Sequence, residues 1–211
     1  RDSVKEARKI QRYISERIVE KEINEVNLVA GLDCSYYDKK IITAIIFYDI
    51  KNKEVINSEY SINEIYFPYI PTLLFLREGP FMVSLIKKSK MEADVYFIDG
   101  HGKAHPFGAG LACYVGYLIG MPTVGIAKKK LFGNVVWKNS EGEIVYNYKK
   151  IGYVIKLCDK EFYISVGNMI TLHSAVEIFK RCIKGCDFMP LLKAHEFANF
   201  IRKNYKKSNM E

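Results

Sequence analysis

Three strand-like stretches follow one another with only short polar turns between them, and this order limits the folds open to the chain. The stretches span residues 26–36, 41–49 and 54–61, with turns at Asp38–Lys40 and Lys51–Lys53. Connections this short join antiparallel neighbours, because a parallel pair needs a much longer crossover. The first part of the chain therefore predicts a three-stranded antiparallel meander.

Strands and helices alternate in the middle of the chain. Strand-like residues 94–99 and 122–126 flank a helix of small residues expected over 108–119. A strand–helix–strand order predicts parallel pairing through a right-handed crossover. Joined to the meander, these strands predict an α/β fold, a mixed five-stranded sheet with helices on its faces.

Helical spacing and hairpin patterns account for the remaining elements. Apolar residues recur at helical spacing from Ser3 to Ile18, so we expect a packing helix without chemistry there. A helical stretch over 72–78 should break at Gly79-Pro80, and Pro80 should start a new helix that runs to about Lys90. Later elements are expected to be extra hairpin strands and two helices: strands over 134–137, 144–157 and 161–166, and helices over about 171–183 and 191–206.

The length and composition fit one domain. With 211 residues, 49% of them hydrophobic, the chain can bury a single core, and it has no internal repeat or linker. We therefore expect one domain of ordinary size over residues 1–211. No apolar run reaches about 18 residues, and Arg1–Arg8 lack the apolar stretch of a signal peptide, so we expect no membrane association.

The cysteines give little indication of function. They are five in number: Cys34, Cys113, Cys158, Cys182 and Cys186. Cys182 and Cys186 could share a helix face, but no nearby His or Cys pair completes a zinc site. We expect free buried thiols, which suit a reducing, cytoplasmic location.

The charge balance favours a polyanionic partner, but only weakly. The formal net charge is +8, and basic residues cluster at Lys128–Lys130 and Arg202–Lys207. For any single cluster, a solvated surface is the ordinary explanation.

Two aspartates end strongly apolar, strand-like runs. Asp33 closes the run that starts at Val26, and Asp99 closes the run that starts at Val95. Burying an unpaired carboxylate costs several kcal/mol, so both residues need an explanation. In the predicted sheet the strand ending at Asp99 can lie beside the first strand. We therefore expect the two carboxylates to be neighbours that share a divalent cation.

Glu78 adds a third carboxylate at the end of an apolar helical turn. Alone, a solvent-facing or arginine-paired glutamate is the more common explanation. Two or three carboxylates with open coordination positions suit Mg²⁺, which can activate a water for phosphodiester hydrolysis.

Other side chains have both a functional and an ordinary explanation. Lys128 ends a strand and could stabilise a phosphate, or it is a surface lysine. His195 lies on the last helix, where a histidine is more often structural. His101 and His105 in the glycine-rich loop after Asp99 could be metal ligands, although no third soft ligand is evident. Tyr69, between two prolines, could stack on a base or wedge into a duplex, or it caps the core.

Five segments, in this order and spacing, resemble the endonuclease V family: Gly31–Asp33, Phe67–Pro71, Phe75–Pro80, Ile98–Pro106 and Pro122–Lys128. The resemblance covers about residues 5–205. It implies a ribonuclease H-like fold and a role in DNA repair. It also implies cleavage of the second phosphodiester bond 3′ to a deaminated base, chiefly inosine, which leaves 3′-hydroxyl and 5′-phosphate ends. The implied cofactor is Mg²⁺, with Mn²⁺ able to substitute.

The resemblance assigns residues to the catalytic centre. It implies that Asp33 and Asp99 bind the metal and that Glu78 assists them. Lys128 matches the family's active-site lysine, and His195 matches its late histidine.

The resemblance also assigns a recognition site. Tyr69 matches the tyrosine of a strand-separating wedge. Gly100, His105 and Gly125 resemble the pocket that receives the flipped hypoxanthine. Flipping costs a few kcal/mol and is cheapest at a mismatch, which contributes to selectivity.

Three positions depart from the family pattern. Thr72 stands where glycine is common, Phe107 where arginine is common, and Asn168 where histidine is expected. The carboxylates are intact, so these departures concern the base pocket, the range of lesions and the choice between DNA and RNA.

Three alternatives remain open from the sequence. The chain could be an inosine-RNA-directed ribonuclease, or another ribonuclease H-like, structure-specific nuclease that has no need of Tyr69. A non-catalytic nucleic-acid-binding module would be expected to have a damaged carboxylate set. The expected partner is DNA or RNA containing deaminated bases, and no obligatory protein partner is evident.

Overall fold

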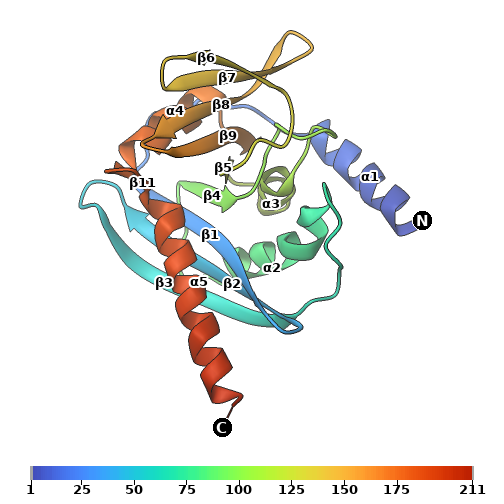
Figure 1. Cartoon of the computed structure of the whole chain (residues 1–211), viewed down its shortest axis with the longest axis vertical. Coiled ribbons are helices and arrows are strands. Elements are labelled where there is room, and N and C mark those ends of the chain that lie inside the picture. The colour runs from blue at the N-terminus through green and yellow to red at the C-terminus, as the bar shows by residue number, and fades with distance from the viewer. Residues whose placement is uncertain (1, 211) are drawn as a thin grey trace.

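A mixed sheet of nine strands forms the centre of the computed structural model, which describes residues 2–210 (Figure 1). The strand order is β3-β2-β1-β4-β5-β9-β8-β7-β6. The strands are β1 (Leu28–Tyr37), β2 (Lys40–Asp49), β3 (Glu54–Glu64), β4 (Val95–Asp99), β5 (Thr123–Ala127), β6 (Asn134–Lys138), β7 (Glu141–Tyr146), β8 (Lys149–Leu157) and β9 (Lys160–Asn168).

The predicted five-stranded core is present. Strands β1 to β3 form the antiparallel meander, and β4 and β5 pair in parallel with β1 and with each other. The hairpin strands extend the same sheet, because β9 pairs antiparallel with β5. The central strands are apolar on both faces, as strands covered on two sides must be.

Helices cover both faces of the sheet. Within residues 2–210 they are α1 (Asp2–Ser15), α2 (Leu74–Lys88), α3 (Leu111–Ile119), α4 (Leu172–Arg181) and α5 (Met189–Ser208). Helices α2 and α3 pack on one face, against Tyr96 and Ile98 of β4. Helices α4 and α5 pack on the other, against Phe97 of the same strand. Figure 1 shows α5 lying across β1 and β2. None of these helices is long and apolar enough to cross a membrane.

The prediction that Gly79-Pro80 breaks a helix is wrong. Helix α2 continues through Pro80, with Phe75, Met82 and Ile86 buried on its inner side. A proline inside a helix costs about 3 kcal/mol. Burying each large apolar side chain stabilises the protein by about 1.5–3 kcal/mol. The burial of several such side chains therefore stabilises the helix by more than the proline costs.

The predicted strand over 144–157 is also wrong, since it is two strands. Asn147 and Tyr148 form the turn between β7 and β8, with φ of 47° and 61°. Glycine is the usual second residue of such a turn, and a tyrosine there hides the turn from sequence inspection.

The expectation of free thiols is wrong for two cysteines. Cys158 and Cys186 form a disulfide, with their Cα atoms 5.8 Å apart. It links the β8–β9 turn to a small unpredicted hairpin, β10 (Ile183–Lys184) and β11 (Asp187–Phe188). The two residues are 28 positions apart in the chain, so only the folded topology reveals the pair. Cys34, Cys113 and Cys182 are free.

Candidate active site

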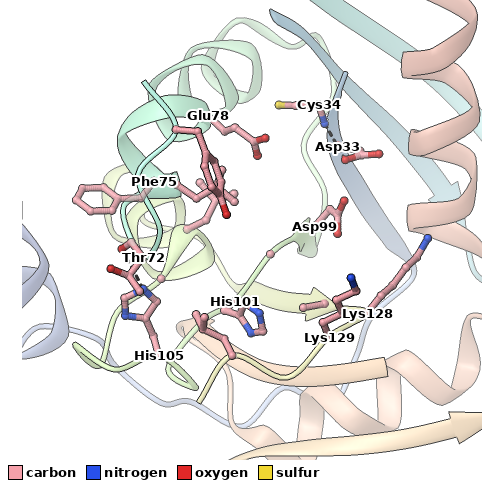
Figure 2. A pocket seen from close by; sticks show the side chains of 17 residues that line it. Asp33, Cys34, Thr72, Phe75, Glu78, Asp99, His101, His105, Lys128 and Lys129 are labelled. Atoms are coloured by element: carbon pink, nitrogen blue, oxygen red, sulfur yellow. Dashed lines mark hydrogen bonds between the residues drawn. The ribbon is translucent and has the colours of Figure 1, made fainter. Parts of the chain in front are cut away.

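Asp33 and Asp99 lie side by side at one edge of the sheet. Strands β1 and β4 are parallel neighbours, and their last register pair is Leu32 with Ile98. The next residue on each strand is therefore an aspartate, and both side chains face the same pocket (Figure 2). The predicted proximity of these carboxylates is confirmed.

Glu78 approaches the same pocket from α2. Its side chain is buried, and Figure 2 shows its carboxylate facing the space beside Asp33 and Asp99. The Tyr36 hydroxyl, from β1, donates a 2.5 Å hydrogen bond to Glu78 Oε1. The Arg77 guanidinium lies 4.8 Å from the centre of the Tyr36 ring. Tyr36 and Arg77 therefore hold the glutamate in place.

Burial gives the three carboxylates abnormal acidities. Burial, reinforced by the charge of Asp33, raises the pKa of Asp99 to about 8. Burial raises the pKa of Glu78 to about 7, although the hydrogen bond from Tyr36 opposes the shift. The pKa of Asp33 is also raised, mainly by burial. Near neutral pH the cluster therefore retains protons, and a cation beside it would favour their release.

These residues fit a magnesium ion. Mg²⁺ is commonly bound through one or two carboxylates and keeps several waters. Asp33 and Asp99 provide such a pair at the wall of an open pocket. In the part of the chain that the structure describes, no three His, Cys, Asp or Glu side chains converge as a complete ligand set. Water and substrate oxygens would therefore supply the other ligands.

The pocket has a volume of about 440 Å³. It lies between the carboxylates, the loop after β4 and the segment after β5 (Figure 2). Of the residues predicted from the sequence, Tyr69, Gly100, His105 and Lys128 line it. Tyr69 is 67% exposed, so it stands at the rim and does not cap the core.

Gly125 lies behind this pocket and is not in its lining. It belongs to β5, and a side chain there would overlap the backbone of Gly100, His101 and Gly102. Its missing side chain lets the glycine-rich loop lie directly on the sheet.

His105 is fixed by two backbone groups. Its Nε2 lies 3.1 Å from the Thr72 carbonyl oxygen, and its Nδ1 accepts a hydrogen bond from the Phe107 N–H. The carbonyl can only accept, so Nε2 carries the proton. Burial lowers the pKa of His105, and also that of His101, to about 4. Both rings are therefore neutral, and neither nitrogen of His105 is free to bind a metal.

Helix α1, predicted to be a packing helix without chemistry, supports the pocket loops. Arg8 donates a 2.7 Å hydrogen bond to the Thr72 hydroxyl, and its guanidinium lies 3.7 Å above the Phe107 ring. Buried Gln11 donates to the carbonyls of Thr72 and Ala109. Thr72 and Phe107, two of the three departures from the family pattern, are thus joined through one arginine.

The third departure has a structural role. Asn168 is buried at the end of β9. Its amide oxygen accepts from the Val19 N–H, and its amide nitrogen donates to the Gly116 carbonyl. It links the segment after α1 to α3.

His195 reaches the aspartates because α5 approaches β1 closely. A side chain at Gly31 would overlap the carbonyl of Pro190, at the start of α5. His195 Nδ1 lies 2.8 Å from Asp33 Oδ2, and Asn199 Nδ2 lies 3.0 Å from His195 Nε2. His195 lines a smaller pocket of about 70 Å³ on the other side of the aspartates.

Sequence inspection missed the supporting residues around this centre. Asn199 follows His195 by four positions on one helix, a spacing that predicts contact. Tyr36 and Arg8 had no comparable indication, because their partners lie 42 and 64 positions away in the chain.

The Endonuclease V family model matches residues 9–196 of this chain. Endonuclease V of Thermosipho melanesiensis is 39% identical over 204 residues, which cover 93% of this chain and 90% of that protein. Endonuclease V of Pyrococcus abyssi is 39% identical over 189 residues, which cover 90% of this chain and 88% of that protein.

Solved structures of the same family have the same fold. Endonuclease V of Bacillus subtilis superposes with a TM-score of 0.88 at 27% identity, covering 95% of this chain and 92% of that one. Endonuclease V of Ciona intestinalis, in complex with DNA containing an inosine followed by a ribo-adenosine, gives a TM-score of 0.86 at 22% identity, with coverages of 98% and 99%. The predicted ribonuclease H-like fold is confirmed.

Proposed function

This chain belongs to the endonuclease V family, and from that premise we propose that it is a Mg²⁺-dependent endonuclease directed at deaminated bases. As a member of that family it is a nuclease that hydrolyses phosphodiester bonds. Its substrate is nucleic acid containing inosine, cut at the second phosphodiester bond 3′ to the lesion. Residues 1–211 form one catalytic domain.

The observation that carries this proposal is the set of three carboxylates around one open pocket, two of them buried and Asp99 half-buried. Asp33 and Asp99 would hold the metal, and Glu78 would assist them from α2. When bound, Mg²⁺ supplies activation of a water and offsets the charge that develops on the phosphate. Mn²⁺, which takes similar oxygen ligands, would substitute.

The remaining residues of the centre orient the carboxylates and the phosphate. His195 fixes Asp33 through its Oδ2, and Tyr36 fixes Glu78. Lys128 lies close enough to Asp33 and Asp99 to favour their ionised forms. The same ammonium group would bind the phosphate that is cut and stabilise its transition-state charge.

Base recognition would use the other wall of the pocket. A pocket of about 440 Å³ is large enough for a flipped purine base. Gly100 lines that wall, and the neutral His105 holds the loop beside it through its hydrogen bonds to two backbone groups. Tyr69, exposed at the rim, would fill the space left by the flipped base.

Cleavage assays test this proposal. DNA and RNA oligonucleotides that contain inosine or adenosine at one position should be incubated with Mg²⁺, with Mn²⁺ and with a chelator. We expect metal-dependent cutting of the inosine strands only, and the product ends will locate the cut bond. Equal cutting of inosine and control strands would overturn the specificity. Preferential cutting of branched DNA would favour a structure-specific nuclease instead.

A matched pair of variants tests the metal centre. Asp33→Asn should lower turnover about 100-fold or more, because it removes a charge from the metal pair, while substrate binding persists. Asp38→Asn makes the same chemical change in the exposed β1–β2 turn and should leave turnover unchanged. Normal turnover by Asp33→Asn would exclude this residue as a ligand.

A further inference from the structure

The β7–β8 hairpin ends in an exposed aromatic residue that nothing in the described chain covers. Tyr148 is 105% exposed at the tip. Figure 1 shows this turn projecting from the end of the sheet. Lys149 follows it and is the cross-strand partner of Tyr146, so these two side chains lie on one face of the sheet. We call Phe132, Tyr146, Tyr148 and Lys149 the hairpin patch.

The backbone at the tip is strained for the residue it carries. Asn147 and Tyr148 both have positive φ, 47° and 61°. Asparagine tolerates this conformation, but a bulky residue there is an outlier, and glycine is the usual choice. A fully exposed ring gains no packing energy that would offset the strain. Strain retained at an exposed tip points to a role for the side chain itself.

The hairpin patch is continuous with the wall of the pocket. Lys128, Lys129 and Leu131 line the pocket. The next residue, Phe132, packs its ring 4.5 Å from that of Tyr146. Two residues beyond Tyr146 the chain reaches the tip. A nucleic-acid strand that leaves the pocket along Lys128–Phe132 would therefore meet Tyr148 and Lys149 next.

The charge of this region suits a phosphate backbone. Residues 128–150 carry six lysines and two glutamates, a net charge of +4, against +8 for the whole chain. Lys150 pairs with Glu143. Within residues 2–210, the lysines 128, 129, 130 and 149 have no carboxylate partner. Unpaired lysines interleaved with exposed aromatic rings are the pattern that binds single strands by charge and stacking.

We propose that the hairpin patch is a second nucleic-acid contact, which holds one flank of the substrate strand outside the catalytic pocket. Tyr148 stacks on a base of that flank, and Lys149 pairs with a phosphate. The identity of the ligand as substrate rests on the proposed function. The contact itself does not depend on which base occupies the pocket.

Substitutions at the tip separate binding from folding. Tyr148→Gly removes the ring and also relieves the strained backbone, so its melting temperature should equal or exceed that of the parent protein. Its affinity for a long inosine strand, measured by fluorescence anisotropy in a chelator, should fall about 5- to 100-fold. Tyr148→Phe should bind normally, because the stacking face remains. Lys149→Ala should also weaken binding, whereas Lys53→Ala, in the exposed β2–β3 turn, should not.

The length of the oligonucleotide on each side of the lesion supplies the decisive measurement. Trimming one flank of the substrate to a few nucleotides should abolish the difference between the parent protein and Tyr148→Gly, while trimming the other flank should preserve it. The affinity ratio should be the same for inosine and adenosine strands. Unchanged affinity of Tyr148→Gly for the long strand, or an equal loss on both trimmed strands, would overturn the contact. If the protein bound inosine and adenosine strands equally well, but Tyr148→Gly still weakened binding, only the proposed function would be overturned.

Discussion

At the scale of single residues, the centre gathers three carboxyl groups whose pKa values are all raised, so the metal-free protein keeps protons there near neutral pH. Asp99 lies half-buried beside Asp33, and its pKa of about 8 lies far above the value of about 4 expected in an unfolded chain. Below pH 4 both states are protonated. Between about pH 4 and pH 8 the folded state keeps a proton that the unfolded chain releases, so the metal-free protein must lose stability as the pH rises through this range.

This linkage predicts that the metal-free protein is less stable at pH 8 than at pH 5, by roughly 2–4 kcal/mol. Urea unfolding in a chelator at the two pH values measures the difference. Asp99→Asn has no such proton to lose, so its stability should change less, and at pH 8 it should exceed that of the parent protein. Equal stability of the parent protein at both pH values would contradict the burial of an ionisable pair.

Tyr36 makes a second prediction at this scale. Its hydroxyl donates to Glu78 and so lowers a pKa that burial raises to about 7. In Tyr36→Phe the pKa of Glu78 should be higher still, so the ionised form should appear only at higher pH. We expect about 10- to 100-fold less activity at pH 7 and partial recovery near pH 9.

The pH profile distinguishes this effect from a general loss of structure. Tyr37→Phe makes the same change at the neighbouring residue, whose ring packs against Tyr205, and its profile should match that of the parent protein. If the activity of Tyr36→Phe fell at the same acidic pH as that of the parent protein, Tyr36 would be excluded as the residue that lowers the pKa of Glu78.

At the scale of elements, the sequence predicts most of the sheet but misjudges where elements end. The two aspartates were found because each interrupts an apolar run, a local feature that any fold must explain. Pro80 and Tyr148 misled the prediction for the opposite reason. Proline disfavours a helix interior, but packing on the sheet keeps α2 continuous through Pro80. Tyrosine disfavours positive φ, but the pairing of β7 with β8 fixes the turn between them.

The disulfide is the clearest element that only the fold could reveal. Cys158 and Cys186 close a loop with a sequence separation of 28 and fasten the β10–β11 hairpin to the β8–β9 turn. Beside it, Lys160 pairs with Asp187 at 2.7 Å. Both of these residues line the small pocket next to Asp33 and Asp99, so the hairpin forms part of the wall behind the catalytic centre.

This bridge predicts a stability difference that depends on redox conditions. Replacing both cysteines by serine should lower the free energy of unfolding by about 2–4 kcal/mol, mainly because the unfolded chain is no longer constrained. A reducing agent should lower the stability of the parent protein by a similar amount and leave the variant unchanged. A double variant as stable as the oxidised parent would show that the bridge contributes nothing.

At the scale of the whole molecule, the positive charge is distributed unevenly around the sheet. Half of the net charge falls in residues 128–150, which run from the pocket wall to the β7–β8 tip. Composition alone does not predict this distribution, because a net charge does not say where the fold places the charged residues. Each lysine that neutralises a phosphate releases condensed counterions, so its contribution is visible in the salt dependence of binding.

We therefore predict that the salt dependence of binding comes from this side of the molecule. A double variant, Lys130→Gln with Lys149→Gln, should reduce the slope of log affinity against log salt by about 1.8 for a duplex. Lys51→Gln with Lys53→Gln removes the same charge from the β2–β3 turn, at the left edge of Figure 1, and should leave the slope unchanged. Affinity measured in a chelator over a series of salt concentrations compares the two pairs. Equal slopes for both double variants would mean that the field of the whole molecule, and not this path, attracts the substrate.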